Sequence, residues 1–370
     1  MQRKNLIQLV IYAAVCAAIL ALPLFVNDDF MLNRIARYLA LAMVSMALSL
    51  SWGYAGILNL GQAMSFGLGS YAMAMALKLR TIPVHTGSEG LPDFMVWNNV
   101  ESLPLLWQPF YSMTFAILAG ILVPALLSAV LGWFMFRGRV TGVYVAIITL
   151  ATLVVVNLLI VDQQSLTGGF NGITDLAQLE LFGITFDAYS SNTYYLVAIC
   201  LTASLLFAWA LTKSKAGLIL MAIGDHESRV RFFGYDVAPY KTAVFAVSAG
   251  IAGLAGMLYT IVMEFASPTF LGVQLSLSIV VWCAVGGRQS LVGAMLGAIV
   301  VAGTQGALSE SEAFLDTWTL IMGALFVLVV LLLPNGLASL PDLIRYRFAK
   351  ASIARKQAAA EATVKAAEVK

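Results

Sequence analysis

Two neighbouring stretches of the chain decide its fold class. Residues 112–136 read SMTFAILAGILVPALLSAVLGWFMF, and residues 141–161 read TGVYVAIITLATLVVVNLLIV. Neither stretch contains a charged residue, and each reaches the roughly 20 residues that a helix needs to cross the hydrocarbon core of a bilayer. The short connection between them carries Arg137 and Arg139. We therefore predict two membrane-spanning helices joined by a tight cytoplasmic turn.

The same pattern recurs along the chain. Of its 370 residues, 61% are hydrophobic and 11% are charged, whereas a soluble domain carries roughly 25% charged residues. We predict an all-α integral membrane protein with about ten transmembrane helices. The expected spans are 6–26, 33–51, 57–79, 112–136, 141–161, 193–212, 240–263, 271–286, 290–308 and 317–333. Glycine and polar residues inside the third span predict that this helix is broken.

The distribution of basic residues predicts the topology. With ten spans and a cytoplasmic N-terminus, most of the 21 Lys and Arg residues lie on the cytoplasmic side, as the positive-inside rule requires. The other four, Arg34, Arg37, Lys78 and Arg80, lie near outer helix ends, where long side chains can extend to the membrane surface. Both termini are then cytoplasmic. Residues 1–340 form the expected transmembrane domain, with large outer loops at 80–111 and 162–192 that are either polar connectors or docking sites for an external partner. Residues 341–370 are rich in Ala, Lys and Glu, and we predict a disordered tail.

The residue types exclude several kinds of chemistry. No predicted span has an ionisable residue near its centre, which disfavours coupling to an ion gradient. The sequence lacks the G-x-x-x-x-G-K-[ST] phosphate-binding loop, so an ATP-driven pump would need its ATPase on a separate chain. Cys16, Cys200 and Cys283 have no paired spacing, which argues against a metal site. We expect no catalytic residues, no metal and no cofactor, and therefore no enzyme.

Residues 214–234 have a different character. Apolar residues follow an approximately helical spacing there, and charged residues fill the remaining positions. This pattern predicts a short amphipathic helix between two spans. The pattern alone fits equally well a helix that docks on a partner protein and a helix that lies on lipid headgroups.

A series of short motifs along the chain resembles the motifs of a known protein family. The chain carries, in this order, WGYAG at 52–56, LGQA at 60–63, FGLGSY at 66–71, GVYVAIITL at 142–150, TGG at 167–169, NGI at 171–173, AG at 216–217, AI at 222–223, YK at 240–241, AGLAG at 252–256, SP at 267–268, GG at 286–287 and PNGL at 334–337. Together they resemble the branched-chain amino-acid-type permeases of ATP-binding-cassette (ABC) importers, over roughly residues 30–340.

Within this family the chain resembles the urea-transport branch. The features are GLPDFMVW at 90–97, MEFASP at 263–268 and VWCAVGGRQSLVGA at 281–294. The resemblance implies a permease in the bacterial cytoplasmic (inner) membrane that forms a heterodimer with a homologous second permease. It further implies two ATPase subunits that bind the ATP, a periplasmic substrate-binding protein, and no nucleic acid.

The resemblance also implies that residues 214–234 are the coupling helix that docks on an ATPase. The coupling residues expected there are Gly217, Ala222, Ile223, Asp225, Glu227, Arg229 and Gly234. Many relatives carry an arginine after the Ala222-Ile223 pair, where this chain has Gly224-Asp225. This departure puts the ion pairs at the ATPase interface in doubt.

Polar residues in the third span suggest a transport path. Asn59, Gln62, Ser65 and Ser70 interrupt an otherwise apolar helix, and Thr149 and Thr152 in the fifth span are secondary candidates. Urea is small, planar and neutral, so amide and hydroxyl side chains suit it. The alternative is that these residues, like the stripe of Gly250, Gly253 and Gly256, only permit close helix packing.

Other functions stay open at the level of sequence. A permease for branched-chain amino acids or short-chain amides would share the same motifs. A passive urea channel would need no ATPase. A membrane-embedded enzyme would need clustered ionisable or metal-binding groups within the spans, and the predicted spans contain none.

Overall fold

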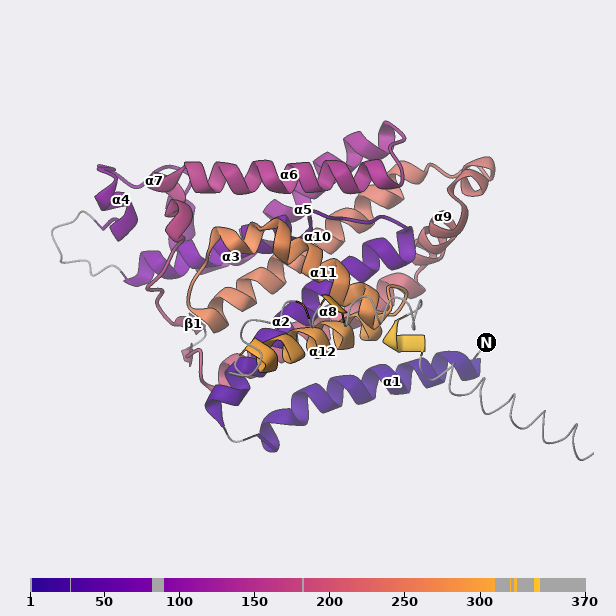
Figure 1. The fold of residues 1–370 in the computed structure, drawn as a ribbon, viewed down its shortest axis with the longest axis horizontal. Coiled ribbons are helices and arrows are strands. Elements are labelled where there is room, and N and C mark those ends of the chain that lie inside the picture. The colour runs from indigo at the N-terminus through magenta and orange to yellow at the C-terminus, as the bar shows by residue number, and fades with distance from the viewer. Residues whose placement is uncertain are drawn as a thin grey trace, which may run out of the picture.

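The computed structural model describes residues 2–26, 28–81, 90–181, 183–309, 320, 323–324 and 336–339. Ten longer helices make up most of this part of the chain: α1 (Gln2–Ala21), α2 (Asp29–Ser49), α3 (Gln62–Thr81), α5 (Met113–Arg137), α6 (Val143–Asp162), α8 (Ser191–Lys213), α9 (Lys215–Phe232), α10 (Val237–Met263), α11 (Val273–Gly286) and α12 (Leu291–Ser309). Apart from α9, which curves across one end of the bundle, these helices run roughly side by side (Figure 1).

Short elements connect these helices. They are η1 (Leu22–Leu24), the π-helical turn η2 (Leu50–Tyr54), α4 (Asp93–Trp97), η3 (Gln108–Tyr111), α7 (Gln164–Thr167), η4 (Gly169–Asn171), η5 (Pro268–Leu271) and η7 (Leu337–Ser339). Strands β1 (Leu179–Leu181) and β2 (Ile184–Phe186) pair antiparallel, with Leu179 opposite Phe186. This small hairpin, inside the expected outer loop 162–192, is a local exception to the all-α fold predicted from the sequence.

Six helices in the described residues are long and apolar enough to cross a membrane. They are Asp29–Ala55, which joins α2 to η2, and α5, α6, α8, α10 and α12. Two further apolar helices, Val10–Leu24 and Val273–Gly286, are shorter. The chain is therefore a mostly helical, multi-pass membrane protein. The expected span 317–333 and the tail 341–370 lie largely or wholly outside the described residues, so the number of ten spans and the side of each terminus stay predictions.

Helices α2 and α10 form the centre of the bundle. About three quarters of the most apolar window of each is buried inside the protein, compared with 33% for α5 and 22% for α6. Helix α10 packs against α2, α3 and α5, while α6 lies along one long edge of the bundle and α1 along the opposite edge (Figure 1). Because their outward sides are apolar and exposed, α5 and α6 present a surface suited to lipid.

Glycines allow the central helices to approach closely. A Cβ on Gly256 would lie 1.8 Å from the carbonyl oxygen of Phe66 in α3, and one on Gly253 would lie 2.3 Å from that of Gly120 in α5. Gly250 is different, because its nearest neighbours would be at an ordinary 3.5 Å. Gly253 and Gly256 therefore contact neighbouring helices of the same chain.

The third predicted span begins later than expected. The sequence suggested a helix from residue 57, but residues 57–60 are not helical and α3 starts at Gln62. The preceding residues continue α2 through the π-helical turn η2. The chain thus crosses from α2 to α3 through irregular backbone, and its polar groups need partners other than a helix.

Candidate transport path and coupling surface

The irregular backbone at 57–61, called here the junction, forms hydrogen bonds with side chains of two other helices, α6 and α11. The backbone N–H of Leu60 donates to Thr149 Oγ1 in α6 at 3.1 Å. Ser276 Oγ in α11 donates to the Leu60 carbonyl oxygen at 2.5 Å. A Cβ on Gly61 would lie 2.4 Å from the Thr149 carbonyl oxygen, so glycine permits this approach. The junction is therefore held by side chains that reach it from distant parts of the sequence.

Two of the expected path residues complete this arrangement. Asn59 Nδ2 donates to Gln62 Oε1 at 2.7 Å, and Asn59 Oδ1 accepts from the N–H of Gly61 at 2.9 Å. Gln62 Nε2 donates to the carbonyl and hydroxyl oxygens of Ser248 in α10, both at 3.2 Å. Both side chains are buried. In the structure these two side chains hold the junction, and a direct contact with the solute stays a prediction.

The remaining path candidates are dispersed. Ser70 Oγ lies 2.6 Å from Thr260 Oγ1 in α10, and Thr152 donates to the carbonyl of Ile148 in its own helix at 2.8 Å. Ser65 is buried and its hydroxyl has no hydrogen-bond partner in the described residues. None of them lines either of the two cavities described below, nor do Asn59 and Gln62, and their role on a path is likewise still a prediction.

A first cavity lies between six elements of the bundle. We call it the Arg37 cavity. It has a volume of about 480 Å³ and is lined by Arg34, Arg37, Tyr38 and Leu41 of α2, Phe66 of α3, Tyr259 of α10, Thr269 and Phe270 of η5, Gln274, Leu275, Ser278 and Trp282 of α11, and Ala302, Gln305, Gly306 and Ser309 of α12. The sequence reading placed Arg34 and Arg37 at an outer helix end and assigned them no site.

A second cavity brings together three of the sequence motifs. This Trp52 cavity, of about 650 Å³, is lined by Trp52, Gly53, Tyr54 and Gly56, by Met221, Gly224 and Asp225 of α9, and by Arg288 and Gln289 between α11 and α12. Close contacts surround it: a Cβ on Gly53 would lie 1.8 Å from the Arg288 carbonyl oxygen, and one on Gly224 would lie 2.7 Å from that of Tyr54. The Arg288 guanidinium lies 5.7 Å from the centre of the Trp52 ring.

Helix α9 coincides with the expected coupling helix. It begins after Ser214, whose hydroxyl accepts from the N–H of Gly217, and its backbone is kinked at His226. Among the expected coupling residues, Gly217 and Ile223 are buried, Glu227 is half-buried, and Ala222, Asp225, Arg229 and Gly234 are exposed. Two neighbouring aromatics that were not among them, Phe232 and Phe233, are 90% and 81% exposed.

Glu227 connects α9 to the central helix α10. Its carboxylate is 2.5 Å from Lys241 Nζ and 2.5 Å from Arg231 NH2. Burial alone would raise the pKa of Glu227, but the hydrogen bond and charge of Lys241, together with Arg231, outweigh it and hold the pKa below its ordinary value. The sequence reading missed Lys241, which is fourteen residues away from Glu227.

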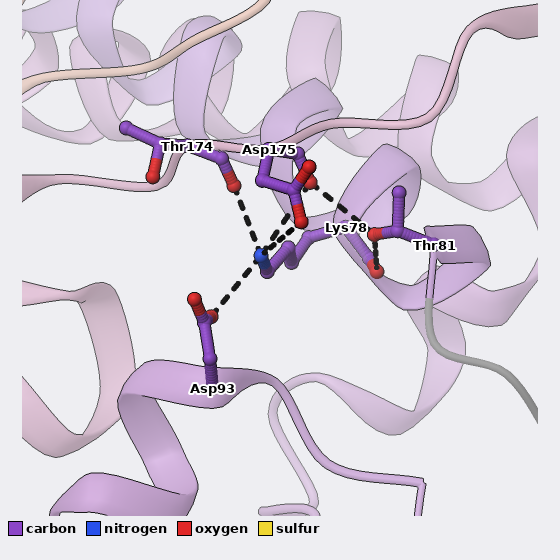
Figure 2. Close-up of polar contacts among 5 residues, drawn as sticks. All are labelled: Lys78, Thr81, Asp93, Thr174 and Asp175. Carbon is purple, nitrogen blue, oxygen red and sulfur yellow. Dashed lines mark hydrogen bonds and ion pairs between the residues drawn. The ribbon is translucent and has the colours of Figure 1, made fainter. Parts of the chain in front are cut away.

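Lys78 forms a clamp at the opposite end of the bundle (Figure 2). Its Nζ lies 3.1 Å from Asp93 Oδ1 in α4 and 3.5 Å from Asp175 Oδ2, and it donates to the Thr174 carbonyl oxygen at 3.0 Å. Thr81 Oγ1 also donates to the Asp175 carbonyl oxygen, at 3.3 Å. The sequence reading expected Lys78 to extend towards the membrane surface, whereas its side chain is only 5% exposed and fastens two loops to α3.

Comparisons with known proteins identify the same family as the motifs. Residues 30–330 match the family described as branched-chain amino acid transport system / permease component. The high-affinity branched-chain amino acid transport permease LivM of Salmonella typhimurium is 31% identical over 60% of this chain and 56% of its own length. LivM of Escherichia coli K12 is 30% identical over 54% and 51%.

A relative with a different solute also matches. The ribose import permease RbsC of Haemophilus influenzae is 27% identical over 59% of this chain and 68% of its own length. The match thus spans about half the length of the first LivM relatives and about two thirds of RbsC. No solved structure gives a significant match.

Proposed function

Because this chain belongs to the family of branched-chain amino acid transport system permease components, we propose that it is the membrane subunit of an ATP-driven importer of urea. In this proposal it forms half of the translocation path with a homologous second permease in the bacterial inner membrane. Two separate ATPase subunits bind and hydrolyse ATP, and a periplasmic binding protein delivers the solute. The chain itself is a transport subunit and not an enzyme.

Support for a separate ATPase comes from α9. The helix lies at the end of the bundle opposite α4 and α7 (Figure 1), and it exposes Asp225, Arg229 and the two aromatics at its C-terminal end. Its other side is fixed to α10 through Glu227 and Lys241. A helix that is exposed on one side and attached to the central helix on the other suits a partner protein that transmits a conformational change to the bundle. A passive channel would not need such a helix.

The observation that carries urea as the solute is the segment at 90–97. Its GLPDFMVW sequence is the first feature that resembles the urea branch, and it includes helix α4, which lies at the end of the bundle opposite α9 (Figure 1). Phe94 and Met95 are buried, and Asp93 pairs with Lys78. The segment that resembles the urea branch is therefore attached to α3, the helix that follows the junction.

A second candidate solute is a branched-chain amino acid or a short-chain amide. The names of the two LivM relatives favour it. The permease fold is compatible with either solute, because a delivering protein outside the membrane would select which one arrives.

Uptake of radiolabelled urea tests the proposal. Cells with and without this gene are compared at micromolar urea, before and after ATP depletion, with leucine as competitor. We expect the deletion to remove an ATP-dependent uptake that leucine does not inhibit. Unchanged urea uptake together with a loss of leucine uptake would overturn the urea assignment and leave the amino-acid candidate.

A further inference from the structure

Arg37 is an arginine whose hydrogen-bonding capacity the protein leaves largely unused. It lies eight residues after the first residue of α2, about 12 Å along the helix axis. Its NH1 contacts the Met263 sulfur at 3.7 Å, which is a weak acceptor, and its Nε is buried without an acceptor. Within the part of the chain that the structure describes, no carboxylate forms an ion pair with it.

The neighbouring Arg34, by contrast, has a hydrogen-bond acceptor for its Nε. Its Nε donates to the hydroxyl of Tyr38 at 3.0 Å, one turn further along α2. Arg37 as a whole is half-buried, but its Nε is shielded from water and lacks an acceptor, which is costly, and charged residues in membrane-spanning segments usually serve a function. An acceptor for Arg37 that arrives from outside the chain would account for its state.

The walls of the Arg37 cavity suit a small planar amide. Phe66, Tyr259 and Phe270 form one aromatic wall, with ring centres 5.2 to 6.1 Å apart. Gln274 and Gln305 contribute amide oxygens from α11 and α12. A flat molecule could lie against the rings, accept at its oxygen from a guanidinium and donate its own N–H groups to the amides.

We propose that the Arg37 cavity is a solute-binding site on the transport path, in which the Arg37 guanidinium donates hydrogen bonds to the carbonyl oxygen of urea. The inference rests on the urea import proposed above and adds the place where the solute is held. Phe66 is four residues after Gln62, so the site adjoins the junction through a single turn of α3. The positive charge at this site also opposes the passage of cations.

The test uses the complete importer, with this permease and its partner subunits, in proteoliposomes that contain ATP. Radiolabelled urea uptake is measured at saturating binding protein for Arg37→Met, Arg37→Lys and Arg80→Gln. Arg80 is exposed on the last turn of α3 and does not line the cavity, so its variant is the matched control for a lost positive charge. Basal ATP hydrolysis and yield report whether each complex is assembled.

We expect Arg37→Met to lower the maximal uptake rate by about tenfold or more, which is the scale of a lost hydrogen bond to a charged group. The half-saturating urea concentration should change little, because the binding protein sets it. Arg37→Lys, which keeps a cationic donor, should recover part of the rate, and Arg80→Gln should match the wild type. Basal ATP hydrolysis should persist in all three.

Two results would overturn the inference while urea import stands. One is uptake by Arg37→Met within twofold of the wild type. The other is an equal loss in the Met and Lys variants accompanied by loss of basal ATP hydrolysis, which indicates a structural role. A wild-type importer that carries leucine instead of urea would overturn the proposed function. If that leucine uptake depended on Arg37, the acceptor at this site would be a carboxylate.

Discussion

The ion pair between α9 and α10 leads to an asymmetry that can be measured. Lys241 is the more deeply buried partner, with a side chain 8% exposed compared with 21% for Glu227. The Glu227→Gln substitution leaves the Lys241 ammonium buried without a counter-charge, next to the Phe136 ring at 5.4 Å. Lys241→Met replaces the ammonium with an apolar group of similar length, and Glu227 keeps Arg231 as its partner.

The two substitutions should therefore lower the free energy of unfolding by different amounts. Removing one partner of a buried pair costs about 3–5 kcal/mol where the other charge stays fully buried, and the partial exposure here brings the expectation for Glu227→Gln to about 2–3 kcal/mol. For Lys241→Met we expect about 1 kcal/mol or less. The double variant should resemble Lys241→Met alone, since no uncompensated ammonium is left.

Thermal unfolding of the purified complex in lipid nanodiscs, followed by tryptophan fluorescence, measures this order. Coupling is read in parallel as the number of ATP molecules hydrolysed per solute imported, which should rise for Glu227→Gln. If Lys241→Met were the more destabilising substitution, or if the double variant were worse than both, the carboxylate would not be compensating the buried ammonium and the reasoning would fail.

The remaining predictions concern acid stability, helix packing, the clamp and the junction. Because the pKa of Glu227 is depressed, its contribution to stability is present above its ordinary value of 4.5 and is lost as pH falls through the lower folded value; stability scans below pH 5 should show a steeper acid loss for the wild type than for Glu227→Gln. Gly256→Ala, whose Cβ would meet the Phe66 carbonyl oxygen at 1.8 Å, should prevent assembly, whereas Gly303→Ala, with its nearest atom at 3.9 Å, should melt like the wild type. Lys78→Met should lower the free energy of unfolding by about 1.5–3 kcal/mol, the scale of a hydrogen bond to a charged group, in a denaturant titration. Gln62→Ala should reduce uptake at unchanged complex yield, and uptake equal to the wild type would remove it from the transport path.

Much of the helical framework could be predicted from the sequence, because long apolar stretches admit only a few structures in a bilayer. The expected span 112–136 corresponds to α5 at Met113–Arg137, and 193–212 corresponds to α8 at Ser191–Lys213. The amphipathic pattern at 214–234 likewise matches α9, because its polar positions interrupt the apolar spans on either side. These features depend on local composition, which a single segment carries by itself.

The sites depend on contacts that no local pattern records. The junction lies at the start of the expected span 57–79, and its backbone hydrogen-bonds to Thr149, Ser276 and Asn59, two of which come from distant helices. The sequence predicted Arg37 near an outer helix end, and its cavity exists only where six elements meet.

Lys78 was assigned the same surface role as Arg37. Its partners Asp93 and Asp175 come from separate loops, one of them nearly a hundred residues away. Ion pairs between residues this far apart in the sequence cannot be predicted from local sequence patterns.

The order of the sites along the chain connects α9 to the Arg37 cavity. Helix α9 touches Tyr54 through Gly224, and this contact leads through the π-helical turn η2 directly into the junction. The junction ends at Gly61, α3 begins at Gln62, and the next turn of α3 brings Phe66 to the wall of the Arg37 cavity. Side-chain hydrogen bonds hold the junction, which lacks the regular backbone hydrogen bonds of a helix. Changing its shape therefore costs less free energy than deforming the helices beside it. In the proposed importer, a displacement of α9 by the ATPase would reach the Arg37 cavity through the irregular backbone of the junction, while the ion pair of Glu227 and Lys241 would keep α9 attached to α10.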